Sequence, residues 1–179
     1  MVLEKKQNEF LDPEKVLDQL ELHSDMVAAE FGCGSGGFLI PLAKRLEDGL
    51  VYGIDILEAP LSALKSRSLL ENVVNIRLIR SNLEKPRGST LTDFSLDLVF
   101  VPNVLFQIDN KNGIINEAYR ILKPNGKLII IDWLPQAANG PETGRIAPKE
   151  VKEMARENKF QLEKEFQTGK YHYCLVFKK

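Results

Sequence analysis

Short apolar runs alternate with amphipathic stretches along the first three quarters of the chain. The apolar runs predict buried strands at residues 26–29, 50–56, 75–79, 96–101 and 127–131. Between them, apolar residues recur at helical spacing at 38–47, 60–71 and 114–122. Strands that alternate with helices in this way predict an α/β fold, a doubly wound sheet that is mostly parallel with helices on both faces.

The two ends of the chain depart from this alternation. Asp12, Pro13 and Glu14 predict a helix start with a polar N-cap and proline at the first helical position. Residues 134–147 hold two prolines and two glycines without apolar periodicity, which predicts a long loop. A helix at 148–158 then precedes two strands, at 161–167 and 171–178, whose short glycine-containing connection predicts a hairpin.

Composition narrows the class of protein. The 179 residues are 44% hydrophobic and 27% charged, which is typical of one globular domain spanning 1–179. The net charge of −1 favours neither nucleic acid nor an acidic membrane as a partner. No run approaches the roughly 18 apolar residues of a membrane span, and residues 1–10 lack the apolar core of a signal peptide, so we expect a cytoplasmic protein. Cys33 and Cys174 predict neither a disulfide framework nor a metal site.

A glycine-rich loop, EFGCGSGG at residues 30–37, joins the first strand to the next helix. Its four glycines permit positive φ and leave room for a ligand against the main chain. The first amides of the following helix have no helical partner, so a polar ligand end can dock there. This combination predicts a nucleotide-type binding loop.

The sequence of the loop matches the motifs of two ligand classes, dinucleotides and S-adenosylmethionine. The dinucleotide pattern G-x-G-x-x-G is matched by Gly32, Gly34 and Gly37. The pattern E-x-G-x-G-x-G of S-adenosylmethionine enzymes is matched by Glu30, Gly32, Gly34 and Gly36. A P-loop is excluded because no Gly-Lys-Ser/Thr follows, and a ligand-free turn needs fewer glycines. A dehydrogenase also needs a substrate domain, for which no residues remain, and this favours a methyltransferase.

Over residues 12–179 the chain resembles class I S-adenosylmethionine-dependent methyltransferases of the small-molecule branch. The matching segments are AEFGCGSGGFLIPLA (29–43), VYGID (51–55), SNLE (81–84), LDLVFVPNVLFQ (96–107) and YRILKPNGKLIIIDW (119–133). The resemblance implies a Rossmann-like, seven-stranded sheet whose last strand is antiparallel, which agrees with the terminal hairpin.

The resemblance also implies a set of cofactor contacts. Asp55 would hold both ribose hydroxyls, Ile56 would pack on the adenine, Asn82 would bond the adenine amino group, and Val101 would end its strand beneath the sulfonium. Glu30 would order the glycine loop, whose backbone would line the methionine part. The full set of implied S-adenosylmethionine contacts is Glu30, Gly32, Cys33, Gly34, Gly36, Asp55, Ile56, Asn82, Leu83 and Val101.

Candidates for contact with the methyl acceptor follow strands four and five, because ligands bind at the carboxyl edge of such sheets. They are Asn103, Gln107, Asp132 and Trp133. Asn103 and Asp132 are the candidates for a catalytic role, although methyl transfer needs a base only if the acceptor must lose a proton. Asp132 is either that base or a cap for the next loop, and Trp133 is either a packing residue or a substrate platform.

The remaining predictions concern the acceptor and its cover. Arg145 either pairs an acidic acceptor or faces water, and we expect His172 to be structural. We expect residues 1–11 to form a flexible segment or lid and residues 134–147 to form an active-site loop.

Composition and motifs also argue against two related groups of methyltransferases, those that act on arsenite and those that act on nucleic-acid amines. Arsenite methylation is disfavoured because Cys174 is the only cysteine outside the glycine loop, and nucleic-acid amine methylation because 101–104 lack an Asn/Asp-Pro-Pro-aromatic run. We therefore expect a small-molecule acceptor and no metal. The alternatives are a non-catalytic S-adenosylmethionine-binding scaffold and an NAD-binding protein.

Overall fold

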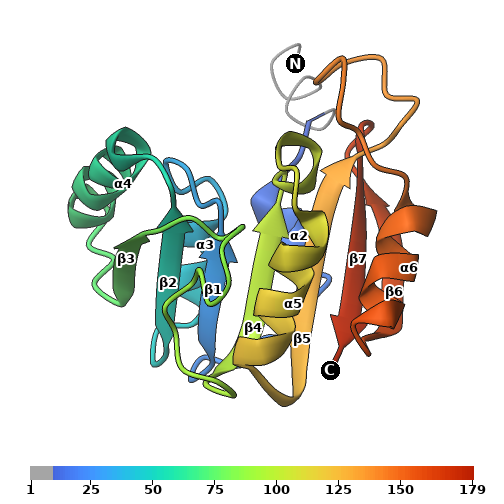
Figure 1. Ribbon diagram of the computed structural model, residues 1–179. Coiled ribbons are helices and arrows are strands. Elements are labelled where there is room, and N and C mark those ends of the chain that lie inside the picture. Colours follow the sequence, from blue (N-terminus) through green and yellow to red (C-terminus); the bar gives the residue numbers. More distant parts are fainter. Residues whose placement is uncertain (1–9) are drawn as a thin grey trace.

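The computed structural model, which describes residues 10–179, contains one seven-stranded sheet in the order β3-β2-β1-β4-β5-β7-β6 (Figure 1). The strands are β1 Val27–Phe31, β2 Leu50–Asp55, β3 Ile76–Arg80, β4 Leu96–Pro102, β5 Leu122–Trp133, β6 Gln161–Thr168 and β7 His172–Lys178. Strands β1 to β5 pair in parallel, and β7 is antiparallel to both β5 and β6. The predicted mostly parallel sheet with a C-terminal hairpin is therefore confirmed.

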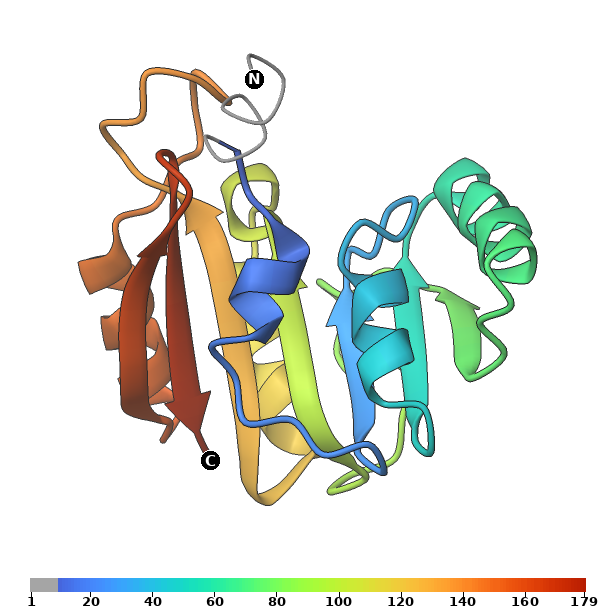
Figure 2. The same ribbon diagram turned by 180° about the vertical axis from the view of Figure 1, so that it is seen from behind.

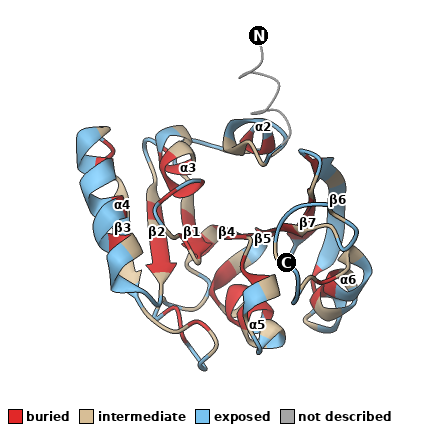
Figure 3. Ribbon diagram, turned by 90° about the horizontal axis from the view of Figure 1, so that it is seen from above, coloured by how far each residue is buried: buried red, intermediate tan, exposed pale blue. Residues whose placement is uncertain are grey.

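Helices cover both faces of this sheet. They are α2 Pro13–Leu17, α3 Leu39–Arg45, α4 Glu58–Leu70, the short 3₁₀ helix η1 Leu105–Gln107, α5 Lys111–Ile121 and α6 Pro148–Glu157. Helices α5 and α6 lie on one face, and α2 and α3 lie on the other (Figures 1 and 2). Buried side chains fill the two layers on either side of the strands (Figure 3).

Alternation along β5 assigns its side chains to these two layers. Ile130 belongs to the core under α5 and α6, whereas Ile129 and Ile131 belong to the core under α2 and α3. Because successive residues of a strand point to opposite faces, Asp132 lies on the α5 side and Trp133 on the α2 side. This assignment separates two candidate residues that are adjacent in the sequence.

Local signals set most element boundaries, with two corrections. Asp12 caps α2 as predicted, since its side chain accepts a hydrogen bond from the Glu14 amide at 3.2 Å. Helix α4 begins at Glu58 rather than at Pro60, because a proline is tolerated within the first turn. Strand β5 begins at Leu122 rather than at 127, because Leu122 pairs with Leu96 before the register shifts.

Two further observations bear on the sequence predictions. Throughout residues 10–179, no helix combines the length and apolar character required for crossing a membrane. The predicted lid at 1–11 falls mostly outside the described residues; at its end, the Phe10 ring lies 5.6 Å from the Tyr171 ring, between centroids.

Candidate functional site

The glycine loop is tied to the end of β2 by backbone hydrogen bonds. The Gly32 amide donates to the Ile54 carbonyl at 2.8 Å, and the loop therefore lies directly beside Asp55. One carboxylate oxygen of Asp55 accepts from the Gly34 amide at 2.9 Å, and the other accepts from the Leu57 amide at 3.0 Å. The acid at the end of the second strand thus faces the glycine loop, as the motif requires.

The backbone distinguishes the two spellings of the loop. Gly36 has φ +87°, and a Cβ there would lie 2.3 Å from Cδ1 of the buried Leu64. Gly37 does not have a positive φ, and a Cβ there would meet nothing within 4 Å. The fold therefore needs glycine at 36 and not at 37, which favours the E-x-G-x-G-x-G reading over the dinucleotide reading.

A cavity of about 400 Å³ opens beside this loop, at the carboxyl ends of β1 and β2. Six of the ten predicted cofactor residues line it: Gly32, Gly34, Asp55, Ile56, Asn82 and Leu83. The other lining residues were not predicted as cofactor contacts. They are Leu57, Pro60, Ser81, Glu84, Val104, Gln107, Ile108 and Ile114.

The cavity combines an acidic floor with an apolar wall. Its lining includes the carboxylates of Asp55 and Glu84 and, among the described residues, no lysine or arginine. The side chains of Ile56 and Leu57 remain 54% and 59% exposed beside it. A pyrophosphate would meet these carboxylates without a compensating cation, whereas a cationic ligand with a flat ring suits both surfaces.

Four predicted cofactor residues lie behind the lining. Glu30, Cys33, Gly36 and Val101 are all buried and do not line the cavity. Burial, followed by the charge of Asp55, raises the pKa of Glu30 well above its usual range. The Oε2 atom of Glu30 has no hydrogen-bond partner within the described part of the chain. Burial also raises the pKa of the Cys33 thiol.

Val104 occupies the place next to the loop that the sequence analysis gave to Val101. A Cβ on Gly32 would lie 2.6 Å from Cγ2 of Val104, so this side chain closes the β4 side of the cavity. The chain reaches that position because Asn103 adopts φ +55° and turns the backbone after β4. Nothing in the apolar run itself marks that turn.

The segment after β3 is held by its own polar side chains. The Asn82 amide oxygen accepts from the Glu84 amide at 2.9 Å, which leaves it one further lone pair. The Glu84 carboxylate accepts from the amides of Asp109 and Asn110 at 3.0 and 2.9 Å. These bonds fix the β3 side of the cavity to the start of α5.

Asp132, at the carboxyl end of β5, is fully buried under η1. Its carboxylate accepts from the Phe106 amide at 3.3 Å and from the Trp133 amide at 2.8 Å. Burial raises its pKa to about 6. Nearby, the Gln107 side chain donates to the Asn103 carbonyl at 2.9 Å, while the Asn103 Oδ1 atom is buried with no partner among residues 10–179.

Trp133 and His172 form a pair on the other face of the same edge. They are register partners on β5 and β7, with ring centroids 4.1 Å apart and planes inclined by 42°. His172 is 2% exposed, and burial lowers its pKa to about 4. Trp133 Nε1, His172 Nδ1 and His172 Nε2 have no hydrogen-bond partner in the described chain. The sequence analysis named both residues without expecting them to meet.

Arg145 organises the loop at 134–147 from within, a contact that the sequence analysis did not predict. Its guanidinium donates to the carbonyls of Pro141 and Ala137 at 2.6 Å each and to those of Pro135 and Asn139 at 3.1 Å each. The loop rises above the carboxyl edge next to η1 (Figure 1). One side chain therefore gives an irregular segment a fixed internal framework.

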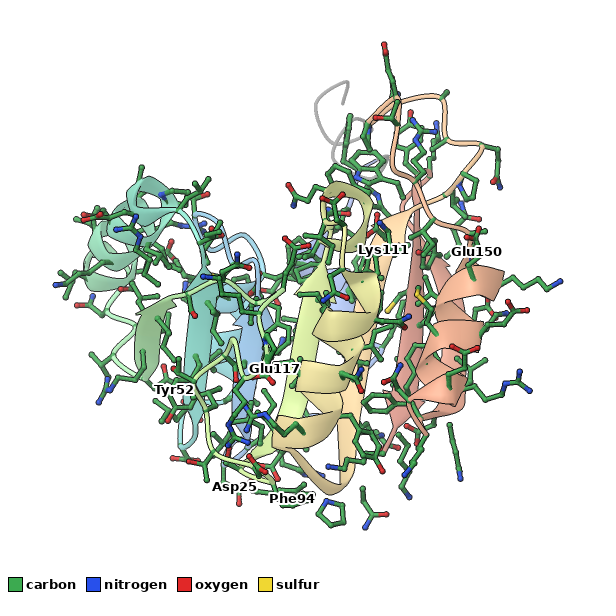
Figure 4. All side chains as sticks on the ribbon, in the orientation of Figure 1. Asp25, Tyr52, Phe94, Lys111, Glu117 and Glu150 are labelled. Carbon is green, nitrogen blue, oxygen red and sulfur yellow. The ribbon has the colours of Figure 1, made fainter. Side chains whose placement is uncertain are left out.

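The loop has two different sides. On the α5 side, a charged hollow of about 520 Å³ is lined by Lys111, Arg145 and Glu150 among others (Figure 4). On the α2 side, Gly140 lies so close to the Trp133 ring that a Cβ there would be 2.4 Å away. The loop thus covers Trp133 directly, whereas the charged hollow lies on the opposite face.

Comparison with known proteins adds a family to this geometry. A family model described as a methyltransferase domain matches residues 22–179. The demethylmenaquinone methyltransferase of Lactobacillus johnsonii is 26% identical over 123 residues, which are 66% of this chain and 48% of that protein. O-methyltransferase 3 of Dictyostelium discoideum is 30% identical over 125 residues, 66% of this chain and 29% of that protein. This chain therefore spans half or less of the length of these curated relatives.

A solved structure extends the likeness to the whole fold. A SAM-dependent methyltransferase from Aquifex aeolicus has a TM-score of 0.86 at 26% identity, with 95% of this chain and 90% of that chain covered.

Proposed function

The chain belongs to the methyltransferase-domain family, and we propose that it transfers the methyl group of S-adenosylmethionine to a small-molecule acceptor by in-line displacement. It is thus a methyltransferase whose methyl donor is S-adenosylmethionine. The cavity beside the glycine loop is the observation that carries the proposal, because its carboxylates and exposed apolar wall suit a cationic nucleoside.

Each part of the donor has a matching group in this chain. Asp55 would keep its bonds to the Gly34 and Leu57 amides and accept the ribose hydroxyls at its remaining lone pairs, and Ile56 with Leu57 would cover the adenine. Asn82 would offer its amide group to the adenine edge. Glu30 lies behind the loop, and its Oε2 atom, which has no partner among residues 10–179, would be available to a polar group of the methionine end.

When bound, S-adenosylmethionine supplies a methyl carbon already activated by a sulfonium. The residues of this chain then have to hold the acceptor in line with that carbon and exclude water. We assign that task to the edge formed by β4, β5 and β7, with the 134–147 loop as its cover. Asn103 and Asp132 are the proposed catalytic candidates there, and residues 1–11 are a proposed second cover.

The names of the relatives leave the acceptor atom open. One relative is named for demethylmenaquinone and another as an O-methyltransferase, so the names do not point to one acceptor. Both names are compatible with a small-molecule acceptor. The family assignment does not support the scaffold alternative, and the acidic cavity disfavours NAD.

Calorimetry with the full chain tests the donor assignment. S-adenosylmethionine and its demethylated product, S-adenosylhomocysteine, should bind and raise the melting temperature, and NAD should do neither. Release of S-adenosylhomocysteine with a small-molecule fraction of cell extract would then establish turnover. Stabilisation by NAD alone would overturn the proposal, and donor binding without release in any fraction would point to the scaffold.

A further inference from the structure

Three ring nitrogens at one buried place have no hydrogen-bond partner among residues 10–179. They are Trp133 Nε1 and both nitrogens of His172, and the two rings touch across the β5–β7 pairing. A buried polar group without a partner costs about 1–3 kcal/mol, so unpartnered groups in a native protein call for an explanation. Simple core packing does not provide one, because a phenylalanine or leucine would fill the same space without that cost.

The position of the pair relates it to the donor cavity. The glycine loop follows β1, and β5 lies two strands away, about 10 Å at the usual strand spacing. Asn103 lies between them, because its amide donates to the Ile131 carbonyl and its own carbonyl accepts from Gln107, which lines the cavity. A molecule of a few rings or less would span this distance.

The unpartnered atoms define what such a molecule must offer. The indole N–H is a donor, and a neutral imidazole presents one donor and one acceptor. Asn103 Oδ1 adds a second acceptor. A hydroxyl group donates once and can accept twice, so one hydroxyl on a ligand would satisfy both donors and one acceptor, and a second hydroxyl would satisfy the other acceptor.

The surroundings exclude a charged ligand and favour a flat one. Arg145, the cation of the covering loop, already bonds four loop carbonyls, and Asp132 lies on the opposite face of the sheet. A net charge on the ligand would therefore be buried without a partner. Trp133 is only partly buried, and the indole ring is a flat surface on which another ring can stack.

We propose that Trp133 and His172 form the acceptor-binding wall of this enzyme and take an uncharged, planar ring molecule that carries a hydroxyl group. The inference rests on the proposed function and names the acceptor class for that same site. Both are positioning residues: they orient the acceptor by hydrogen bonds and stacking, and the donor cavity is built from other residues.

Intrinsic fluorescence gives a direct test, because Trp133 is the only tryptophan in the sequence. With S-adenosylhomocysteine present, phenol should quench the fluorescence of the full chain with a saturating dependence on concentration. Cyclohexanol carries the same hydroxyl on a non-planar ring and should bind at least tenfold more weakly, as measured by competition with phenol. Benzoate, planar but charged, should also compete at least tenfold more weakly.

Variants separate orientation from packing. His172→Phe keeps a ring of similar size and removes both nitrogens, and Trp133→Phe removes the indole N–H. A panel of substituted phenols first identifies one that the enzyme methylates. With that acceptor, each variant should raise the acceptor KM at least tenfold. Each should leave the dissociation constant for S-adenosylhomocysteine within twofold of that of the unmodified chain. Tyr119→Phe is the matched control, because it removes a hydroxyl from an aromatic ring of α5 that packs on Phe160, away from the β5–β7 pair.

The outcomes distinguish the two proposals. Any one of three results, obtained while the donor still binds, would overturn the acceptor wall and leave the donor assignment intact. These results are no saturable quenching by phenol, no methylated phenol in the panel, and an unchanged acceptor KM in His172→Phe. Failure of S-adenosylmethionine to bind would overturn the proposed function itself. If Trp133→Phe does not fold, His172→Phe and the quenching of the unmodified chain still decide the question.

Discussion

Two halves of the same sheet edge satisfy their polar atoms in different ways. At the β1–β2 half, both oxygens of Asp55 hold backbone amides, and the glycine loop is tied to β2. At the β5–β7 half, Trp133 and His172 bury nitrogens that have no partner among residues 10–179. In the first half the acid that faces the cavity is fully paired and only Glu30 Oε2, behind the loop, lacks a partner, whereas in the second half the aromatic nitrogens themselves are left for a ligand to satisfy.

The difference indicates how the two ligands are recognised. The donor half consists mainly of main chain held in one conformation, which lowers the entropy lost when a ligand of fixed chemistry binds. The acceptor half consists of side chains from three strands under a loop, so its chemistry can change by substitution without altering the sheet. The predictions below test each half separately.

The largest effect is expected at Asp55. Asp55→Ala removes the acceptor of two loop amides as well as the proposed partner of two ribose hydroxyls, so S-adenosylmethionine affinity should fall about a hundredfold, or 2.7 kcal/mol. Isothermal calorimetry measures this loss. Asp55→Asn keeps one accepting oxygen, so its affinity for S-adenosylmethionine should lie between that of the unmodified chain and that of Asp55→Ala. Binding within twofold of the unmodified chain in Asp55→Ala would break the donor half of the comparison.

A pH-dependent effect of about 2 kcal/mol is expected at Asp132. Burial raises its pKa from 3.8 to about 6, so between these values the folded chain holds a proton that the unfolded chain has released. The free energy of unfolding therefore falls as pH rises from about 4 to about 6. In Asp132→Asn this loss should be absent, so the unmodified chain should lose about 2 kcal/mol relative to the variant between pH 4 and pH 7 in urea titrations.

The same variant tests a catalytic role. If Asp132 accepts a proton from the acceptor, Asp132→Asn should lower kcat strongly at neutral pH. An unchanged kcat would leave Asp132 as a support for η1 only. Stability curves that run parallel from pH 4 to pH 7 would contradict the raised pKa.

A smaller effect is expected at Arg145, on the acceptor half alone. Arg145→Ala removes donors to four loop carbonyls, so the cover over Trp133 should lose its fixed shape. We expect the acceptor KM to rise about fivefold, roughly 1 kcal/mol, with the donor dissociation constant unchanged. Arg156→Ala, at an exposed arginine of α6, is the matched control. Equal losses for donor and acceptor would contradict the separation of the two halves.

The sequence predicted the donor half better than the acceptor half, for a physical reason. The sheet, the loop and Asp55 follow from short-range rules, because strand ends and glycine positions are local properties of the chain. The pairing of Trp133 with His172 depends on the β5–β7 register, and the cavity position of Val104 depends on the turn at Asn103. Arg145 bonds carbonyls of its own loop, whose path no apolar pattern predicts.

The smallest expected effect sharpens the reading of the donor half. Gly37→Ala places a methyl group in open space at a residue without positive φ, so the free energy of unfolding should change by about 0.5 kcal/mol or less, and donor binding should be unaffected. Gly36→Ala, one position earlier, combines a positive φ with a collision against Leu64 and should cost about 2 kcal/mol or more. Urea titration of both variants measures the contrast. If Gly37→Ala lowered the free energy of unfolding more than Gly36→Ala, the loop would match the dinucleotide motif. The conclusion that the fold needs glycine at 36 and not at 37 would then be wrong.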